Sequence, residues 1–148
     1  MNSQTRAYIF HVVFPVWIGG MITLSLRQDP IPFFGAFHGD LLQGMISSWQ
    51  TAFLPLARGV PSWLAFSLPD ALWCYACVSL ALVCWRDGPR FFRVFWFGVA
   101  LTLSLGFELG QGLHIVPGTF CALDLVFSAA AAALALLATR HSQAGRAP

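Results

Sequence analysis

The chain has 148 residues, of which 57% are hydrophobic and only 9% are charged. Its net charge of +2 comes from arginines spread along the sequence, without a single lysine and without a basic block. This composition, with a mean hydropathy of +0.70, excludes an ordinary soluble domain and a nucleic-acid partner. We expect an integral membrane protein.

Four apolar segments are long enough to cross a bilayer, since a helix needs about 20 apolar residues to span the hydrocarbon core. The first is too long for a signal peptide and lacks a small-residue cleavage site, so we expect it to be retained. The sequence predicts a single all-α transmembrane domain over residues 1–148, with spans at about 7–26, 68–85, 91–113 and 121–139 and a short solvated tail at 140–148.

The first span contains features that disturb a regular helix. Pro15 and the Gly19–Gly20 pair are tolerated in membrane helices and are expected to kink this one. His11 is either a buried hydrogen-bonding group or a polar residue facing the interior of the bundle.

The long connection after the first span, residues 27–67, is rich in aromatic residues, glycine and proline. Asp40, Gln43, Gln50 and Arg58 interrupt it too often for a clean span. An amphipathic segment on the membrane surface or a re-entrant segment suits this pattern. The sequence leaves open whether residues 33–57 cross the membrane.

The arginines predict the orientation of the chain. In a four-span topology one side carries six arginines and the other carries two, Arg27 and Arg58. The positive-inside rule then places both termini and the loop between the second and third spans in the cytoplasm. The six cytoplasmic arginines are Arg6, Arg86, Arg90, Arg93, Arg140 and Arg146.

This topology brings four polar residues to the outer end of the bundle. Asp70 opens the second span, Glu108 and Gln111 close the third, and Asp124 opens the fourth. Glu108 and Gln111 are three residues apart and therefore share a helix face. A carboxylate inside a membrane span costs about 2.5–3.5 kcal/mol on insertion scales and marks a functional site by default.

Three further residues have a weaker connection to this cluster. His114 continues the face of Glu108 and Gln111 if the third helix persists that far. His38 and Asp40, in the long connection, could fold over the same site. Cys74 and Cys77 form a CxxC pair, but no second pair follows, and we expect the cysteines to be free apolar residues.

The polar cluster has a structural and a functional interpretation. Its members could cap helix ends or join spans through hydrogen bonds. Glu108 and Asp124 instead favour chemistry, because two acids at one depth without a basic neighbour indicate a shared proton, a bound cation, or an amine or hydroxyl ligand. Handling a phosphate would call for a divalent metal, which the sequence does not otherwise specify.

Two motifs resemble the VanZ-like family of small bacterial membrane proteins. Glu108-Leu-Gly-Gln111, followed by Pro117-Gly-Thr-Phe-Cys-Ala-Leu-Asp124, is similar to the family's E-x-x-Q and P-G-x-F-D-x-x-D elements. The helix start SLPDALW, residues 67–73, is similar to its leucine-proline-aspartate start. The resemblance covers about residues 61–137. Cys121 stands where many members carry an acid and Cys74 where many carry a histidine, so mechanisms that need those groups are not carried over.

The resemblance implies a protein of the bacterial cytoplasmic membrane, with a polar site at the outer leaflet and a role in the cell envelope or in antibiotic (glycopeptide) resistance. Our first hypothesis is that Glu108, Asp124, Gln111, Asp70 and His114 bind, and in an enzyme modify, a lipid head group or another amphiphile. Glu108 would be the general base or a cation ligand and Asp124 its partner. The alternatives are a non-enzymatic subunit or scaffold, with a membrane-protein partner or as a homo-oligomer, and a transporter or channel.

Overall fold

The computed structural model describes residues 2–27, 40–116 and 119–144. Of these described residues 86% are helical, and none of them belongs to a strand. Within these ranges four helices are long and apolar enough to cross a membrane, namely Gln4–Leu26, Ser62–Cys84, Arg90–Gly112 and Ala122–Thr139. The expected all-α, multi-pass membrane protein is therefore confirmed, and the four helices overlap the four predicted spans.

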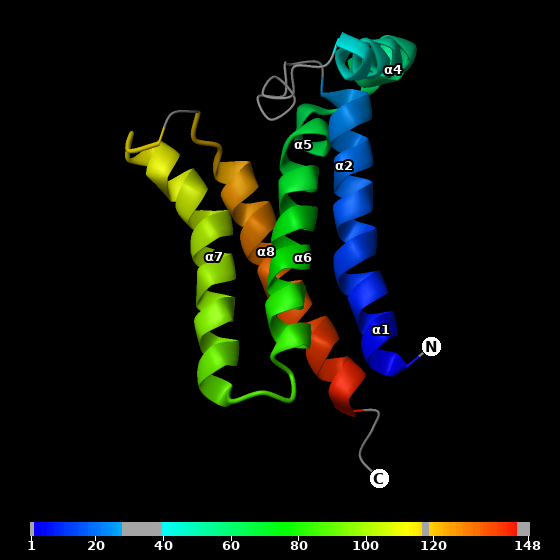
Figure 1. Cartoon of the computed structure of the whole chain (residues 1–148). Coiled ribbons are helices and arrows are strands. Elements are labelled where there is room, and N and C mark those ends of the chain that lie inside the picture. The colour runs from blue at the N-terminus through cyan, green and yellow to red at the C-terminus, as the bar shows by residue number, and fades with distance from the viewer. Residues whose placement is uncertain (1, 28–39, 117–118, 145–148) are drawn as a thin grey trace.

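The elements form a bundle with one helix across its end (Figure 1). The first span consists of α1 (Ser3–Tyr8), a π-helical turn (Ile9–Val13) and α2 (Phe14–Leu26). The second combines α5 (Ser62–Ala65) and α6 (Ser67–Cys84), and the others are α7 (Arg90–Gly112) and α8 (Ala122–Ala144). The α8 helix thus continues beyond residue 139, where a tail was expected. The start of α1, the α6–α7 connection and the end of α8 lie at one end of the bundle.

The long connection contributes α4 (Asp40–Gly59), which lies across the end of α2 at the other end of the bundle (Figure 1). Two hydrogen bonds attach it to the first span: Trp49 Nε1 donates to Ser25 Oγ at 3.1 Å, and Gln50 Nε2 donates to the Arg27 carbonyl at 3.0 Å. This arrangement suits the predicted surface segment. Residues 28–39, which include His38, lie outside the described residues, and so does the side chain of Asp40.

The irregularity of the first span is a π-helical turn next to Pro15. The Phe14 N–H donates to the Ile9 carbonyl, five residues earlier. Proline lacks an N–H, and its ring would clash with the carbonyl four residues before it, that of His11. A wider π turn relieves such a clash.

His11 connects the first span to α6. Its Nδ1 lies 2.6 Å from the Tyr75 hydroxyl, and this hydrogen bond is partly buried. The contact supports the first of the two interpretations of His11, a hydrogen-bonding group inside the bundle. Close approach of the two helices also depends on Gly19, because a Cβ there would lie 2.6 Å from Trp73 Nε1 and 3.4 Å from the Pro69 carbonyl oxygen.

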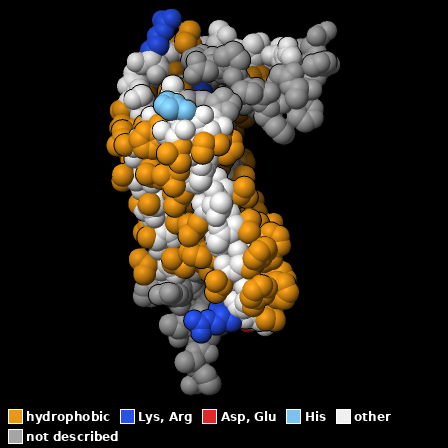
Figure 2. All heavy atoms as spheres, turned by 90° about the vertical axis from the view of Figure 1, so that its left-hand side faces the viewer, with side chains coloured by type: hydrophobic (Ala, Val, Ile, Leu, Met, Phe, Trp, Pro, Cys, Tyr) orange, Lys and Arg blue, Asp and Glu red, His pale blue; other side chains and the backbone are white. Residues whose placement is uncertain are grey.

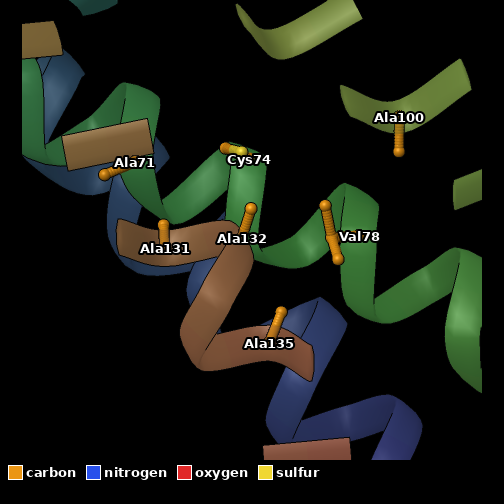
Figure 3. Packing of buried hydrophobic residues seen from close by; sticks show 7 residues of the cluster. All are labelled: Ala71, Cys74, Val78, Ala100, Ala131, Ala132 and Ala135. Carbon is orange, nitrogen blue, oxygen red and sulfur yellow. The ribbon is translucent and has the colours of Figure 1, made fainter. Parts of the chain in front are cut away.

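The core lies between α6 and α8, which run in the same direction and form the most extensive helix contact (Figures 1 and 3). Small side chains allow helix backbones to approach closely in membranes, where the hydrophobic effect does not drive helices together. Ala135 and Val78 are fully buried in this interface. The core cluster comprises Ala71, Cys74, Val78, Ala100, Ala131, Ala132 and Ala135.

The α7 helix is the least buried of the four. Within it only Ala100 and Gly110 are buried. Large apolar side chains such as Phe91, Leu103 and Phe107 are exposed along its length. Figure 2 shows apolar side chains along the length of this face, with white backbone and other side chains between them, and contact with lipid chains requires such apolar side chains.

Replacing a small residue of α8 with a larger one should destabilise the protein only where that residue faces α6. Ala135→Leu inserts a large side chain into a fully buried position and should destabilise the protein by about 1–3 kcal/mol, the usual cost of overpacking. Ala133→Leu is the matched control, because Ala133 is exposed on the same helix. Thermal melting in detergent should show an early transition for the first variant alone. Equal melting of the two variants would contradict close α6–α8 packing.

Candidate functional site

Three helices bring carboxylates to the α4 end of the bundle. Asp70 lies in the first turn of α6 and Asp124 in the first turn of α8. Because these helices are parallel and closely packed (Figure 1), their first turns lie side by side. The α7 helix runs in the opposite direction, so its last part delivers Glu108 to the same level. The positive ends of the α6 and α8 dipoles favour acids in their first turns.

The three side chains form a tight acid cluster. One carboxylate oxygen from each of Asp70, Glu108 and Asp124 lies within 4.8 Å of the others. Asp124 Oδ1 is buried and has no hydrogen-bond partner in the described part of the chain. Glu108 Oε2 accepts one long hydrogen bond, of 3.5 Å, from the Cys121 N–H. The described residues therefore offer these carboxylate oxygens few hydrogen bonds.

Within the described ranges, no basic side chain forms an ion pair with the acid cluster. Among the described residues the one ion pair joins Arg86 and Asp87, at 3.8 Å, in the connection at the other end of the bundle. Arg27 lines the same cavity, and its guanidinium carbon lies 5.0 Å from the centre of the Phe66 ring. Neighbouring carboxylates that ionise together repel one another, so the cluster favours a shared proton or a bound cation.

The acid cluster lines a polar cavity of about 460 Å³. Its walls come from the end of the first span, from α5 and the start of α6, and from the α7–α8 region. Trp63 closes one side and stacks on Phe127 with 5.8 Å between the ring centres. The lining residues are Arg27, Ser62, Trp63, Phe66, Ser67, Asp70, Glu108, Gln111, Thr119, Cys121, Leu123 and Asp124.

A second, more apolar cavity of about 510 Å³ adjoins the first. The two cavities share Asp70, Glu108 and Gln111. The apolar cavity continues between α6 and α7, and its remaining lining is Trp73, Cys74, Cys77, Leu103, Ser104, Phe107 and Ser128. A polar cavity and a more apolar one thus lie next to each other, with the same three side chains in the wall of both.

Four of the five predicted site residues meet in the structure. Asp70, Glu108, Gln111 and Asp124 line one cavity, but His114 does not. The third helix ends at Gly112, and His114 is exposed with a positive φ of 57°. His114 was expected in the site only if the third helix persisted to this residue, and the helix ends before it.

Other lining residues were not singled out from the sequence. Arg27 and Trp63 belong to the long connection, whose folding no pattern in the sequence predicts. The sequence indicates the position of Arg27 alone: this residue directly follows the first apolar run and therefore lies at the same end of the bundle as the acid cluster. The cysteines are free as expected: Cys74 is buried and its thiol donates to the Ser128 carbonyl at 3.3 Å, whereas Cys77 is exposed.

The acid cluster has the donor set for a divalent cation. Mg²⁺ and Ca²⁺ prefer carboxylate and carbonyl oxygens, and three carboxylates could contribute ligands from three helices. The orphaned Asp124 Oδ1 gives one of these oxygens no competing protein partner. The residues present therefore fit a hard cation.

Comparison with known proteins gave no match. No family model matched the chain, and neither did any curated protein or solved structure. The resemblance to VanZ-like proteins consequently depends on the two sequence motifs alone.

Removing charge from the acid cluster should not destabilise the protein. Glu108→Gln combined with Asp124→Asn removes two acids that form no ion pair with any described residue, and it relieves their repulsion. We expect the double variant to melt at or above the wild-type temperature in detergent. Asp87→Asn serves as the control for loss of charge outside the cluster. A double variant that melts several degrees earlier than both would identify the cluster as a structural joint between helices.

Proposed function

We propose that the site binds the polar head group of a membrane lipid or of a lipid-linked envelope component. The observation that carries this proposal is the adjacency of the two cavities, because Asp70, Glu108 and Gln111 line both of them. A head group requires polar and charged partners, whereas its chain requires an apolar groove open to the bilayer. The polar cavity and the groove between α6 and α7 supply these two environments.

The charges of the polar cavity favour a head group that carries both a positive and a negative charge. Arg27 offers a guanidinium suited to a phosphate, and the acid cluster attracts a cation. An amine next to a phosphate matches this pair directly. A phosphate without an amine could reach the cluster through a divalent cation, which would neutralise the carboxylates and supply a Lewis acid.

Each polar residue has a defined role in this proposal. Asp124 and Asp70 hold the cationic partner from the two parallel helices. Glu108 completes the cluster from α7 and is the group placed to accept a proton from an amine or hydroxyl of the ligand. Gln111 follows on the same face of α7 and orients the head group as a hydrogen-bond donor.

We further propose membership of the VanZ-like family, with the site facing outward. The termini of the bundle and most arginines share one end, which the positive-inside rule assigns to the cytoplasm. The acid cluster then lies at the outer leaflet of a bacterial cytoplasmic membrane. A role in the cell envelope or in glycopeptide tolerance follows from the family resemblance and belongs to the same proposal.

Native mass spectrometry with lipid analysis should test the head-group site. The wild-type protein, purified in mild detergent, should retain a lipid that the Glu108→Gln, Asp124→Asn double variant loses, while both remain folded. Asp87→Asn, which changes an acid at the opposite end, should retain it. Adding EDTA separates two modes: loss of the lipid indicates a bridging cation, and retention indicates direct binding of an amine. Equal lipid retention by the wild type and the double variant would contradict the proposal.

A further inference from the structure

A third cavity, of about 310 Å³, lies at the opposite end of the bundle, between α6, α7 and α8. We call it the basic cavity. Its volume is at the lower end of the range for small-molecule sites. Its lining consists of Leu82, Arg90, Arg93, Val94, Phe97, Leu136 and Thr139.

The positive charge of the basic cavity is not neutralised by the protein. Arg90 and Arg93 are three residues apart on α7 and therefore point to the same side of the helix. No acid lines the cavity, and in the described ranges Asp87 is paired with Arg86 instead. The first turn of α7 contains no acid and has no side-chain cap, so the helix dipole adds to the positive potential.

The rest of the lining is almost wholly apolar. Leu82 of α6, Phe97 of α7 and Leu136 of α8 contribute apolar wall from three helices. The one polar group besides the arginines, the Thr139 hydroxyl, donates to the Ala135 carbonyl at 2.8 Å. Figure 2 shows arginine at this end of the face formed by α7, directly below its apolar surface. A ligand that satisfies both parts is an anion with an apolar body.

We propose that the basic cavity binds the phosphate of an anionic membrane phospholipid, with the acyl chains along α7. Guanidinium groups bind phosphate through paired hydrogen bonds, and basic pockets between membrane helices are suited to anionic head groups. This site is separate from the acid cluster and does not depend on its function. A lipid bound here would bridge α7 to α6 and α8, which otherwise hold it loosely.

The positive-inside rule alone does not account for this arrangement. It accounts for the presence of arginines at this end of the bundle, and Arg86 satisfies it equally well. Arg86, however, pairs with Asp87 and does not line the basic cavity. Arg86 therefore provides a matched control for a general effect of positive charge.

The experiment measures the affinity of the purified protein for phosphatidylglycerol by native mass spectrometry, with phosphatidylcholine, a zwitterionic lipid of zero net charge, as the competitor. We expect wild type to prefer phosphatidylglycerol and Arg90→Gln with Arg93→Gln to bind it about tenfold or more weakly, as loss of charge-assisted hydrogen bonds predicts. Arg86→Gln should retain the wild-type affinity. Leu136→Phe, which fills the apolar part of the cavity, should weaken binding without changing any charge, whereas Leu137→Phe, at an exposed position, should not.

Three results would overturn the proposal. Equal losses in the Arg86 variant and in the Arg90 and Arg93 variant would indicate general electrostatic attraction. Equal binding of the two lipids by wild type would show that the cavity does not select an anionic lipid, which contradicts the proposal. Competition by millimolar inorganic phosphate, with no advantage of the lipid over free phosphate, would indicate a soluble anion as the ligand. Thermal melting of each variant in the presence of phosphatidylcholine checks that the protein is folded.

Discussion

The close packing of α6 against α8 is the constraint on which the rest of the structure depends. Ala131, Ala132 and Ala135 present almost no side chain to Ala71, Cys74 and Val78, so the two backbones approach closely (Figure 3). The helices are parallel, and each carries an aspartate in its first turn. The alanine-rich interface therefore does more than build a core. It also holds Asp70 next to Asp124, although their mutual repulsion would separate two less tightly packed helices.

The acid cluster is electrostatically unfavourable, because three carboxylates lie close together at the α4 end of the bundle. In the part of the chain that the structure describes, its three carboxylates have no ion pair and one oxygen is buried without a partner, and the surrounding helices are apolar. Groups of this kind stabilise a protein poorly, and a bound cation or cationic head group would relieve the repulsion. The opposite end has the converse imbalance, with two arginines and no acid around the basic cavity. The molecule thus presents opposite charges at the two ends of its spans.

Much of the site could be predicted from the sequence, because it depends on features that hydropathy defines well. Apolar runs fix where spans begin and end, and alternating direction then brings Asp70, Glu108, Gln111 and Asp124 to one level. Details beyond the helices could not be predicted in this way. The left-handed conformation of His114 ends the face that it was expected to continue. Arg27 and α5 line the cavity because of the way the long connection packs against the bundle. No periodic pattern in the sequence predicts that packing.

The loose packing of α7 gives the acid cluster a mechanical property. Two of its carboxylates belong to the closely packed α6–α8 pair, whereas Glu108 belongs to the least buried of the four spans. A helix that is surrounded mainly by lipid can adjust its tilt to the thickness of the bilayer. A change in the tilt of α7 would move Glu108 relative to the two aspartates, so bilayer thickness would alter the geometry of the acid cluster.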